Sequence, residues 1–166
     1  MLFTLGTSNR SEGEFFDQLA ARRITKIVDV RSRPWSRLAQ FRKPALAIAA
    51  SVHGLQYEWA GELLGGFNDV ATDDPAFLAE LDRLLQEDDP IAIFCSEGSP
   101  AECHRSYKCG AAALVHRGVD PINILRDGGE ERVSRTLLST RVTHIPPCIR
   151  ATALKLAAEH VAASIE

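Results

Sequence analysis

Short apolar runs alternate with longer amphipathic stretches along most of this chain, and this alternation limits the fold more than any other feature of the sequence. The runs are mostly rich in β-branched and aromatic residues, as buried strands are, and they lie at residues 2–5, 24–30, 55–59, 91–94 and 121–125. The stretches between them carry apolar residues at helical spacing. We therefore predict a three-layer α/β fold with a mostly parallel sheet of about five to six strands.

The stretch Ile91–Arg105 carries the densest group of chemically active side chains. Its pattern predicts a buried strand, a small polar loop and the start of a helix. Ser99 is suited to cap that helix, Pro100 is tolerated at its first position, and Glu102 completes a capping pattern. We therefore expect Cys103 in the first turn of a helix.

Further start signals place the other helices. Ser11 with Glu14 forms a capping-box pattern, and Asp73-Asp-Pro75 opens another helix. After Gly129 we expect a short charged helix, an edge strand at 142–145 and a final helix that starts at Pro146-Pro147. No linker or repeat divides the chain. We predict a single α/β domain over 1–166, made of a core at 1–125 and a C-terminal extension at 126–166.

Composition excludes several classes of protein. The chain has 45% hydrophobic and 25% charged residues, which is ordinary for a globular protein. Its net charge of −3 argues against a general electrostatic binder of nucleic acid. We find no secretory signal and no apolar run long enough to span a membrane. The four cysteines match no small secreted scaffold, so we predict a cytoplasmic protein with reduced cysteines and no membrane contact.

Acidic, basic and thiol side chains are expected together at the carboxyl edge of the sheet, where ligands bind in open α/β folds. Asp29 and Glu97 each follow a predicted strand and are candidates for acid/base catalysis, with His104 and Cys103 beside them. Arg105 and the nearby helix start are suited to hold an anion. The alternative is a structural network of ion pairs, for example Asp29 with Arg105.

One basic segment stands out in this acidic protein. Trp35 and Phe41 are interleaved there with a group of cationic residues, namely Arg31, Arg33, Arg37, Arg42 and Lys43. Guanidinium groups match phosphate oxygens, and a tryptophan offers a stacking face, so the segment is a candidate contact for phosphate or nucleic acid. The alternative is a solvated loop whose arginine stems cover apolar surface.

The cysteines allow two kinds of chemistry. A zinc site would use Cys95, Cys103, His104 and Cys109, but this spacing matches no common structural zinc pattern. Adjacent residues on a helix also diverge by about 100 degrees, so we predict no metal. A redox pair of Cys95 and Cys103 is the second kind, because a helix start favours the Cys103 thiolate. The alternative for Cys95 is a buried small residue at a strand end.

Several motifs follow one another in the order of a known family. They are TLGTSNR at 4–10, VDVRSRP at 28–34, FRK at 41–43, ELLGG at 62–66, CSE at 95–97 and CHR at 103–105. With them the chain resembles the bacterial domain of unknown function 488 family as far as about Leu125. The resemblance implies a compact, Rossmann-like α/β domain and no established activity.

The resemblance also singles out individual positions. They are Gly6, Ser8, Asp29, Arg31, Ser32, Pro34, Glu62, Gly65, Cys95, Glu97, Cys103, His104 and Arg105. Family members commonly have histidine where this chain has Thr7, so any catalytic role of that histidine is lost or moved here.

Three hypotheses for function follow. The first is a pocket for a phosphorylated ligand, a nucleotide or a nucleic-acid end, with hydrolysis or transfer of a group on it left open. Its ligand-binding residues are Thr7, Ser8, Arg31, Ser32, Arg33, Cys95 and Arg105. The second is a thiol protein that uses Cys95 and Cys103. The third is a non-catalytic module that binds nucleic acid or a protein through the basic segment. The sequence indicates no particular cofactor.

Overall fold

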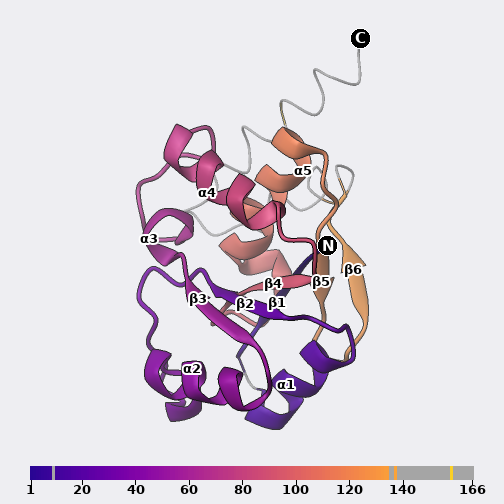
Figure 1. The fold of residues 1–166 in the computed structure, drawn as a ribbon. Coiled ribbons are helices and arrows are strands. Elements are labelled where there is room, and N and C mark those ends of the chain that lie inside the picture. The colour runs from indigo at the N-terminus through magenta and orange to yellow at the C-terminus, as the bar shows by residue number, and fades with distance from the viewer. Residues whose placement is uncertain (9, 135–136, 138–157, 159–166) are drawn as a thin grey trace.

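A six-stranded sheet forms the middle layer of the computed structural model, which describes residues 1–8, 10–134, 137 and 158 (Figure 1). Its strands are β1 (Leu2–Gly6), β2 (Lys26–Asp29), β3 (Gln56–Trp59), β4 (Ile91–Cys95), β5 (Ile122–Ile124) and β6 (Glu130–Arg132). They lie in the order β3-β2-β4-β1-β5-β6, with β1 to β5 parallel and β6 antiparallel. The predicted mostly parallel, Rossmann-like α/β fold is confirmed.

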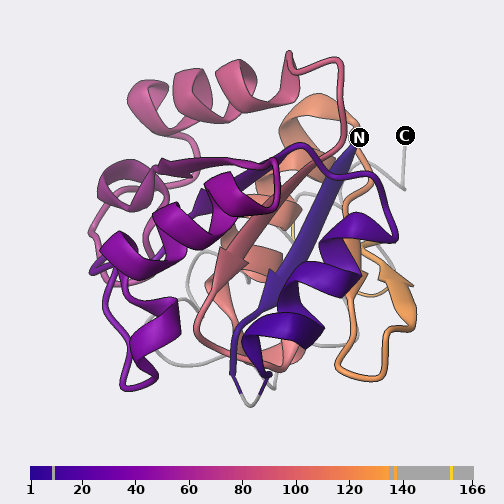
Figure 2. The same ribbon diagram turned by 60° about the horizontal axis from the view of Figure 1, so that its bottom comes forward.

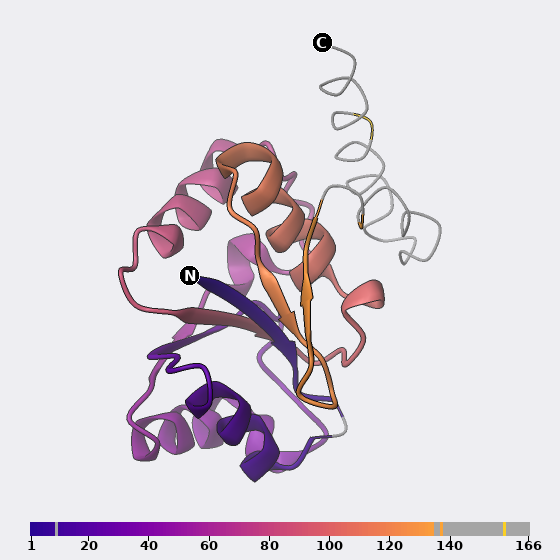
Figure 3. The same cartoon turned by 90° about the vertical axis from the view of Figure 1, so that its right-hand side faces the viewer.

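Helices cover the sheet on both faces (Figure 3). On one face lie α1 (Glu12–Ala20) and α2 (Lys43–Val52), and on the other lie α3 (Gly61–Leu64), α4 (Pro75–Leu85) and α5 (Ala111–Arg117). The predicted Ser11–Glu14 capping box is present at the start of α1, and the Asp74 side chain caps α4. Within the described residues, no helix combines the length and the apolar character that crossing a membrane requires.

The central strands β1 and β4 are apolar along almost their whole length because successive side chains enter opposite cores. Val28 and Ile93 pack with α4 and α5, whereas their neighbours Ile27 and Phe94 pack with α1 and α2. All residues of β1 and β4 are buried. The apolar runs at 2–5 and 91–94 are therefore strands covered on both sides, whereas β3 is partly exposed along its length.

The connections leave neighbouring strands toward opposite faces. The segments after β1 and β2 lead to α1 and α2, whereas the segment after β4 leads to α5 on the other face (Figure 2). Because β4 lies between β2 and β1, a crevice opens at the carboxyl ends of these strands. This is the sheet edge at which the sequence predicts a site.

The predicted helix start at Ser99 is wrong. Pro100–Glu102 form one turn of 3-10 helix, η2, and the Ser99 side chain makes no capping hydrogen bond. Cys103 then adopts an extended backbone, with φ −118° and ψ 134°. The helix begins only at His104, runs through a wide π-helical segment at Arg105–Gly110, η3, and continues into α5. Cys103 therefore precedes the helix instead of lying in its first turn.

The short charged helix expected after Gly129 does not start there, because Glu130–Arg132 form the edge strand β6, and the stretch that follows lies largely outside the described residues. Gly128 has a positive φ of 84°, which allows a tight turn that folds β6 back onto β5. The Leu125 backbone N–H donates to the Gly129 carbonyl across this turn. The predicted strand at 142–145 and the final helix from Pro146 lie outside the described residues.

Gly6 sits where the loops after β1 and β4 touch. A Cβ atom at this position would lie 1.9 Å from the Glu97 carbonyl oxygen. We predict that Gly6→Ala destabilises the protein by about 3 kcal/mol, because backbone on both sides must move. Gly13→Ala is the matched control, since a Cβ there meets nothing within 4 Å. Urea unfolding of both variants measures the difference; equal stabilities would contradict the close approach.

Candidate functional site

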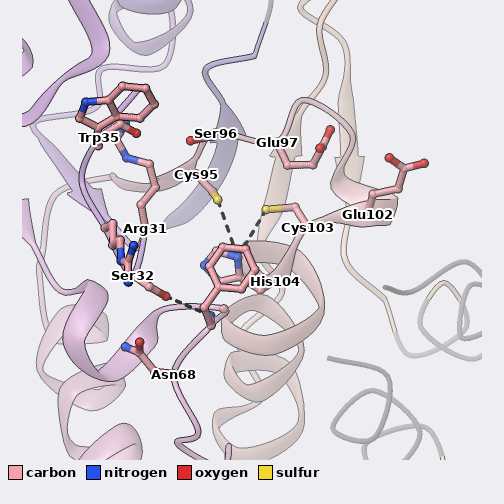
Figure 4. A pocket seen from close by; sticks show the side chains of 13 residues that line it. Arg31, Ser32, Trp35, Asn68, Cys95, Ser96, Glu97, Glu102, Cys103 and His104 are labelled. Carbon is pink, nitrogen blue, oxygen red and sulfur yellow. Dashed lines mark hydrogen bonds between the residues drawn. The ribbon is translucent and has the colours of Figure 1, made fainter. Parts of the chain in front are cut away.

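A cavity of about 780 Å³ opens at the carboxyl edge of the sheet between β2 and β4. Four segments line it (Figure 4): residues 31–35 after β2, 66–68 after α3, 95–97 at the end of β4, and 102–104 at the start of the long helix. Segments far apart in sequence thus meet at one place, as the parallel topology requires.

Two thiols and an imidazole meet on the floor of this cavity. The Nδ1 atom of His104 lies 3.7 Å from the sulfur of Cys95 and 3.8 Å from that of Cys103. The three side chains converge because Cys103 is extended and the helix starts one residue later. The divergence of neighbours on a helix therefore does not apply to Cys103 and His104. We use the name Cys–His cluster for Cys95, Cys103 and His104.

The two thiols of the cluster are electrostatically unlike. Burial opposes ionisation of Cys103, but a hydrogen bond from Cys95 and the positive charge of Arg105 outweigh it, so the pKa of Cys103 lies well below its usual value. The hydrogen bond with Cys103 and burial together raise the pKa of Cys95 well above its usual value. The pair therefore favours one thiolate, on Cys103, while Cys95 keeps its proton.

A hydrogen bond of the other ring nitrogen, Nε2, sets the orientation of the His104 ring. The Nε2–H of His104 donates to the backbone carbonyl of Val30 at 2.8 Å, which leaves the Nδ1 lone pair facing the sulfurs. Gly66 packs directly on the ring, since a Cβ atom there would lie 2.6 Å from it. The neighbouring Gly65 carbonyl accepts a hydrogen bond from the buried Lys108 ammonium at 2.9 Å. The Val30 hydrogen bond and the Gly66 contact together fix the position of the ring.

Arg105 lies behind the floor and does not face the cavity. Its side chain is fully buried, and its two terminal nitrogens donate to the carbonyls of Glu97 and Gly98 at 2.5 and 3.1 Å. These bonds fold the loop after β4 back onto the start of the helix. The structure thus gives Arg105 a supporting place, where the sequence predicted a contact with phosphate.

Asp29 and Arg31 form a buried ion pair in the wall after β2. Two nitrogens of the Arg31 guanidinium donate to the two carboxylate oxygens of Asp29 at 2.8 and 2.5 Å. A third nitrogen donates to the backbone carbonyls of Phe41 and Trp35, and the Tyr57 hydroxyl donates to Asp29. Arg31 borders the cavity, but its donors are used inside the protein, and Asp29 is fully buried.

The remaining predicted residues divide between two cavities. Ser32, Arg33 and Glu97 line the main one together with the Cys–His cluster. Thr7 and Ser8 line a second cavity of about 410 Å³, which shares Trp35 and Ser96 with the first.

Two exposed aromatic rings border the main cavity. Trp35 is 59% exposed and Phe67 is 88% exposed, although large apolar side chains are usually buried. Sequence reasoning assigned Trp35 to the basic segment and missed Phe67, together with Asn68 and Glu102. The glycine pair before Phe67 was the available signal, because it marks a loop, which in the structure follows α3.

Comparison with known proteins supports the resemblance seen in the motifs. Residues 12–75 match the family described as Domain of unknown function DUF488. Over these residues the chain resembles the DUF488 family. The matched part includes the wall with Asp29 and Arg31 and ends before Cys95, so the Cys–His cluster lies outside it. Neither the search of curated proteins nor the search of solved structures found a match.

We predict that Asp29→Asn lowers the free energy of unfolding by about 3 kcal/mol, because it leaves the Arg31 charge buried without its partner. Asp82→Asn, which removes an exposed pair with Arg117, serves as the control and should change stability little. Urea unfolding compares the two. An Asp29→Asn protein as stable as the unsubstituted one would show that the pair does not support the fold.

Proposed function

We propose that this cavity binds a phosphorylated small molecule with a flat ring, such as a nucleotide, and presents it to the Cys–His cluster for hydrolysis or transfer of a group. One observation carries the proposal: a free arginine and two exposed aromatic rings share one cavity with two thiols and an imidazole. Recognition and reactive groups thus face the same space.

Arg33 is the group best placed to take the phosphate. Within the described part of the chain its guanidinium has no hydrogen bond or ion pair, unlike the guanidinium groups of Arg31 and Arg105. A guanidinium offers planar pairs of donors that match phosphate oxygens. Ser32 lies beside it; its hydroxyl oxygen accepts from the Phe67 backbone, and its proton is left to donate to a ligand.

Trp35 and Phe67 supply flat apolar surface for a ring. The Arg42 guanidinium lies over the Trp35 ring, 5.5 Å from its centroid, and steadies one face of it. Exposed aromatic side chains at a cavity bind nucleobases by stacking without requiring a particular base. A ring held there would keep the rest of the ligand inside the cavity.

The acidic side chains of the cavity lie on the side of Cys103, away from Trp35 (Figure 4). Glu97 accepts a hydrogen bond from the Ser99 backbone N–H at 3.1 Å, and Glu102 stands beside it. These carboxylates disfavour phosphate near the Cys103 side and favour it near Arg33. In this proposal Glu97 handles protons for the reaction, whereas Asp29 and Arg105 hold the walls.

The test is a thermal-shift screen of the reduced protein against nucleotides, nucleotide sugars, inorganic phosphate and short oligonucleotides. We predict that a nucleotide well above its dissociation constant raises the melting temperature by at least about 2 °C. Arg33→Ala should abolish this rise, and Arg132→Ala, on the edge strand β6, should keep it. A rise that survives in Arg33→Ala, or no rise with any phosphate compound, contradicts the proposal.

A thiol function is a second candidate because Cys95 and Cys103 are hydrogen-bonded to each other. Oxidation by a small disulfide would remove two electrons and two protons from the pair and form one S–S bond. We predict that the metal-free, chelator-treated protein forms a reversible Cys95–Cys103 disulfide under mild oxidised glutathione, detected by peptide mass spectrometry. Cys109→Ser should retain it, since Cys109 bonds instead to the Leu64 carbonyl. Free thiols throughout would exclude this function. Either function suits a reducing compartment such as the cytoplasm.

A further inference from the structure

We propose that Cys95, Cys103 and His104 bind a zinc-type divalent cation at the floor of the cavity, with one coordination position left open. Among the described residues, these form the one group of at least three His, Cys, Asp or Glu side chains whose ligand atoms converge, all within 4.8 Å of one another. Two thiolates and an imidazole are a ligand set that zinc prefers.

The separations fit tetrahedral coordination. Bonds of about 2.3 Å to sulfur and about 2.0–2.1 Å to nitrogen place the sulfur and nitrogen ligands of one zinc ion about 3.5 Å apart. The two sulfur–nitrogen distances in the structure are 3.7 and 3.8 Å. The two sulfur atoms lie within 4.8 Å of each other, and one zinc ion would hold them about 3.8 Å apart, so side-chain movements of at most about 1 Å complete the site.

The surroundings orient the ligands as metal sites do. Zinc-binding histidines commonly donate their second ring N–H to a carbonyl or carboxylate, which fixes the tautomer and aims the free nitrogen at the metal. His104 does so through the Val30 carbonyl, at 2.8 Å. The Glu97 backbone N–H hydrogen-bonds the Cys95 sulfur and favours its thiolate form. These contacts are present in the fold and need no rearrangement.

Charge balance favours a divalent ion. Binding breaks the one remaining S–H bond, that of Cys95, and forms two metal–sulfur bonds, and one proton leaves to solvent. Two thiolates and a neutral imidazole then neutralise the double positive charge. Without the ion, Cys95 and Cys103 carry only one negative charge between them, which keeps the free-energy cost of burying charge low.

The open position faces the cavity, because all three ligands line it. A cation there would polarise a ligand oxygen or activate a water molecule. The inference does not depend on the phosphorylated ligand proposed above, since the metal would bind without it. The two proposals can also be tested separately. Arg33→Ala removes the contact with the phosphorylated ligand and leaves the metal site, whereas Cys95→Ser removes the metal site and leaves Arg33.

The experiment uses the full chain, purified without a histidine tag and under reducing conditions. Elemental mass spectrometry should find about one zinc per chain. After removal of the metal by a chelator, titration with Co²⁺ should produce a sulfur-to-cobalt charge-transfer band and the intense visible bands of tetrahedral cobalt. Zinc should displace the cobalt and block oxidation of Cys95 and Cys103.

Matched cysteine variants locate the ion. Cys95→Ser and Cys103→Ser should lose the charge-transfer band, and Cys109→Ser, on the same helix as His104 but outside the cluster, should keep it. Circular dichroism confirms that each variant is folded, and His104→Ala is added where it folds. A folded, reduced protein that binds neither ion overturns the inference. So does metal binding that survives in Cys95→Ser, because the ion then lies elsewhere.

Discussion

The arrangement of the site depends on the hydrogen bonds of the buried Arg105 guanidinium. By donating to the carbonyls of Glu97 and Gly98 it bends the loop after β4 back onto the start of the helix. That bend brings Cys95, at the end of a strand, next to Cys103, which lies eight residues further along the chain. The same charge stabilises a negative Cys103 sulfur. One residue thus shapes the floor of the cavity and sets its electrostatics.

The opposite wall is built on the same principle. Arg31 pairs with Asp29 and also donates to backbone carbonyls of the basic segment, so this segment folds against the sheet as a defined wall. Buried charges of this kind are held by partners on the protein and are costly to strip of them. Groups left with free donors or exposed rings, above all Arg33 and Trp35, are the ones that remain for a ligand.

Patterns in the sequence predicted the sheet and the edge at which the site lies, because hydrophobic periodicity and strand direction are properties of the chain itself. The start of the helix was missed for a physical reason. Ser99, Pro100 and Glu102 satisfy a local capping pattern. The backbone at Cys103 is nevertheless extended, and the next residue but one, Arg105, donates a hydrogen bond to the Glu97 carbonyl, a contact that no local pattern predicts. The divergence of neighbouring residues on a helix, which counted against a metal site, does not apply here because Cys103 precedes the helix; the uncommon ligand spacing is unaffected. Side-chain partners are likewise hidden in sequence: Arg31 and Arg33 look alike in the motif, yet among the described residues Arg31 has partners for its guanidinium and Arg33 has none.

The central claim is that Cys95, Cys103 and His104 act as one centre, and X-ray absorption at the zinc edge of the metal-loaded protein tests it most directly. The account predicts a first shell with two sulfur atoms at about 2.3 Å and one or two nitrogen or oxygen atoms at about 2.0–2.1 Å. A shell of nitrogen and oxygen alone would contradict it, as would a shell of four sulfur atoms. Either result would mean that the three side chains lie together without serving one ion.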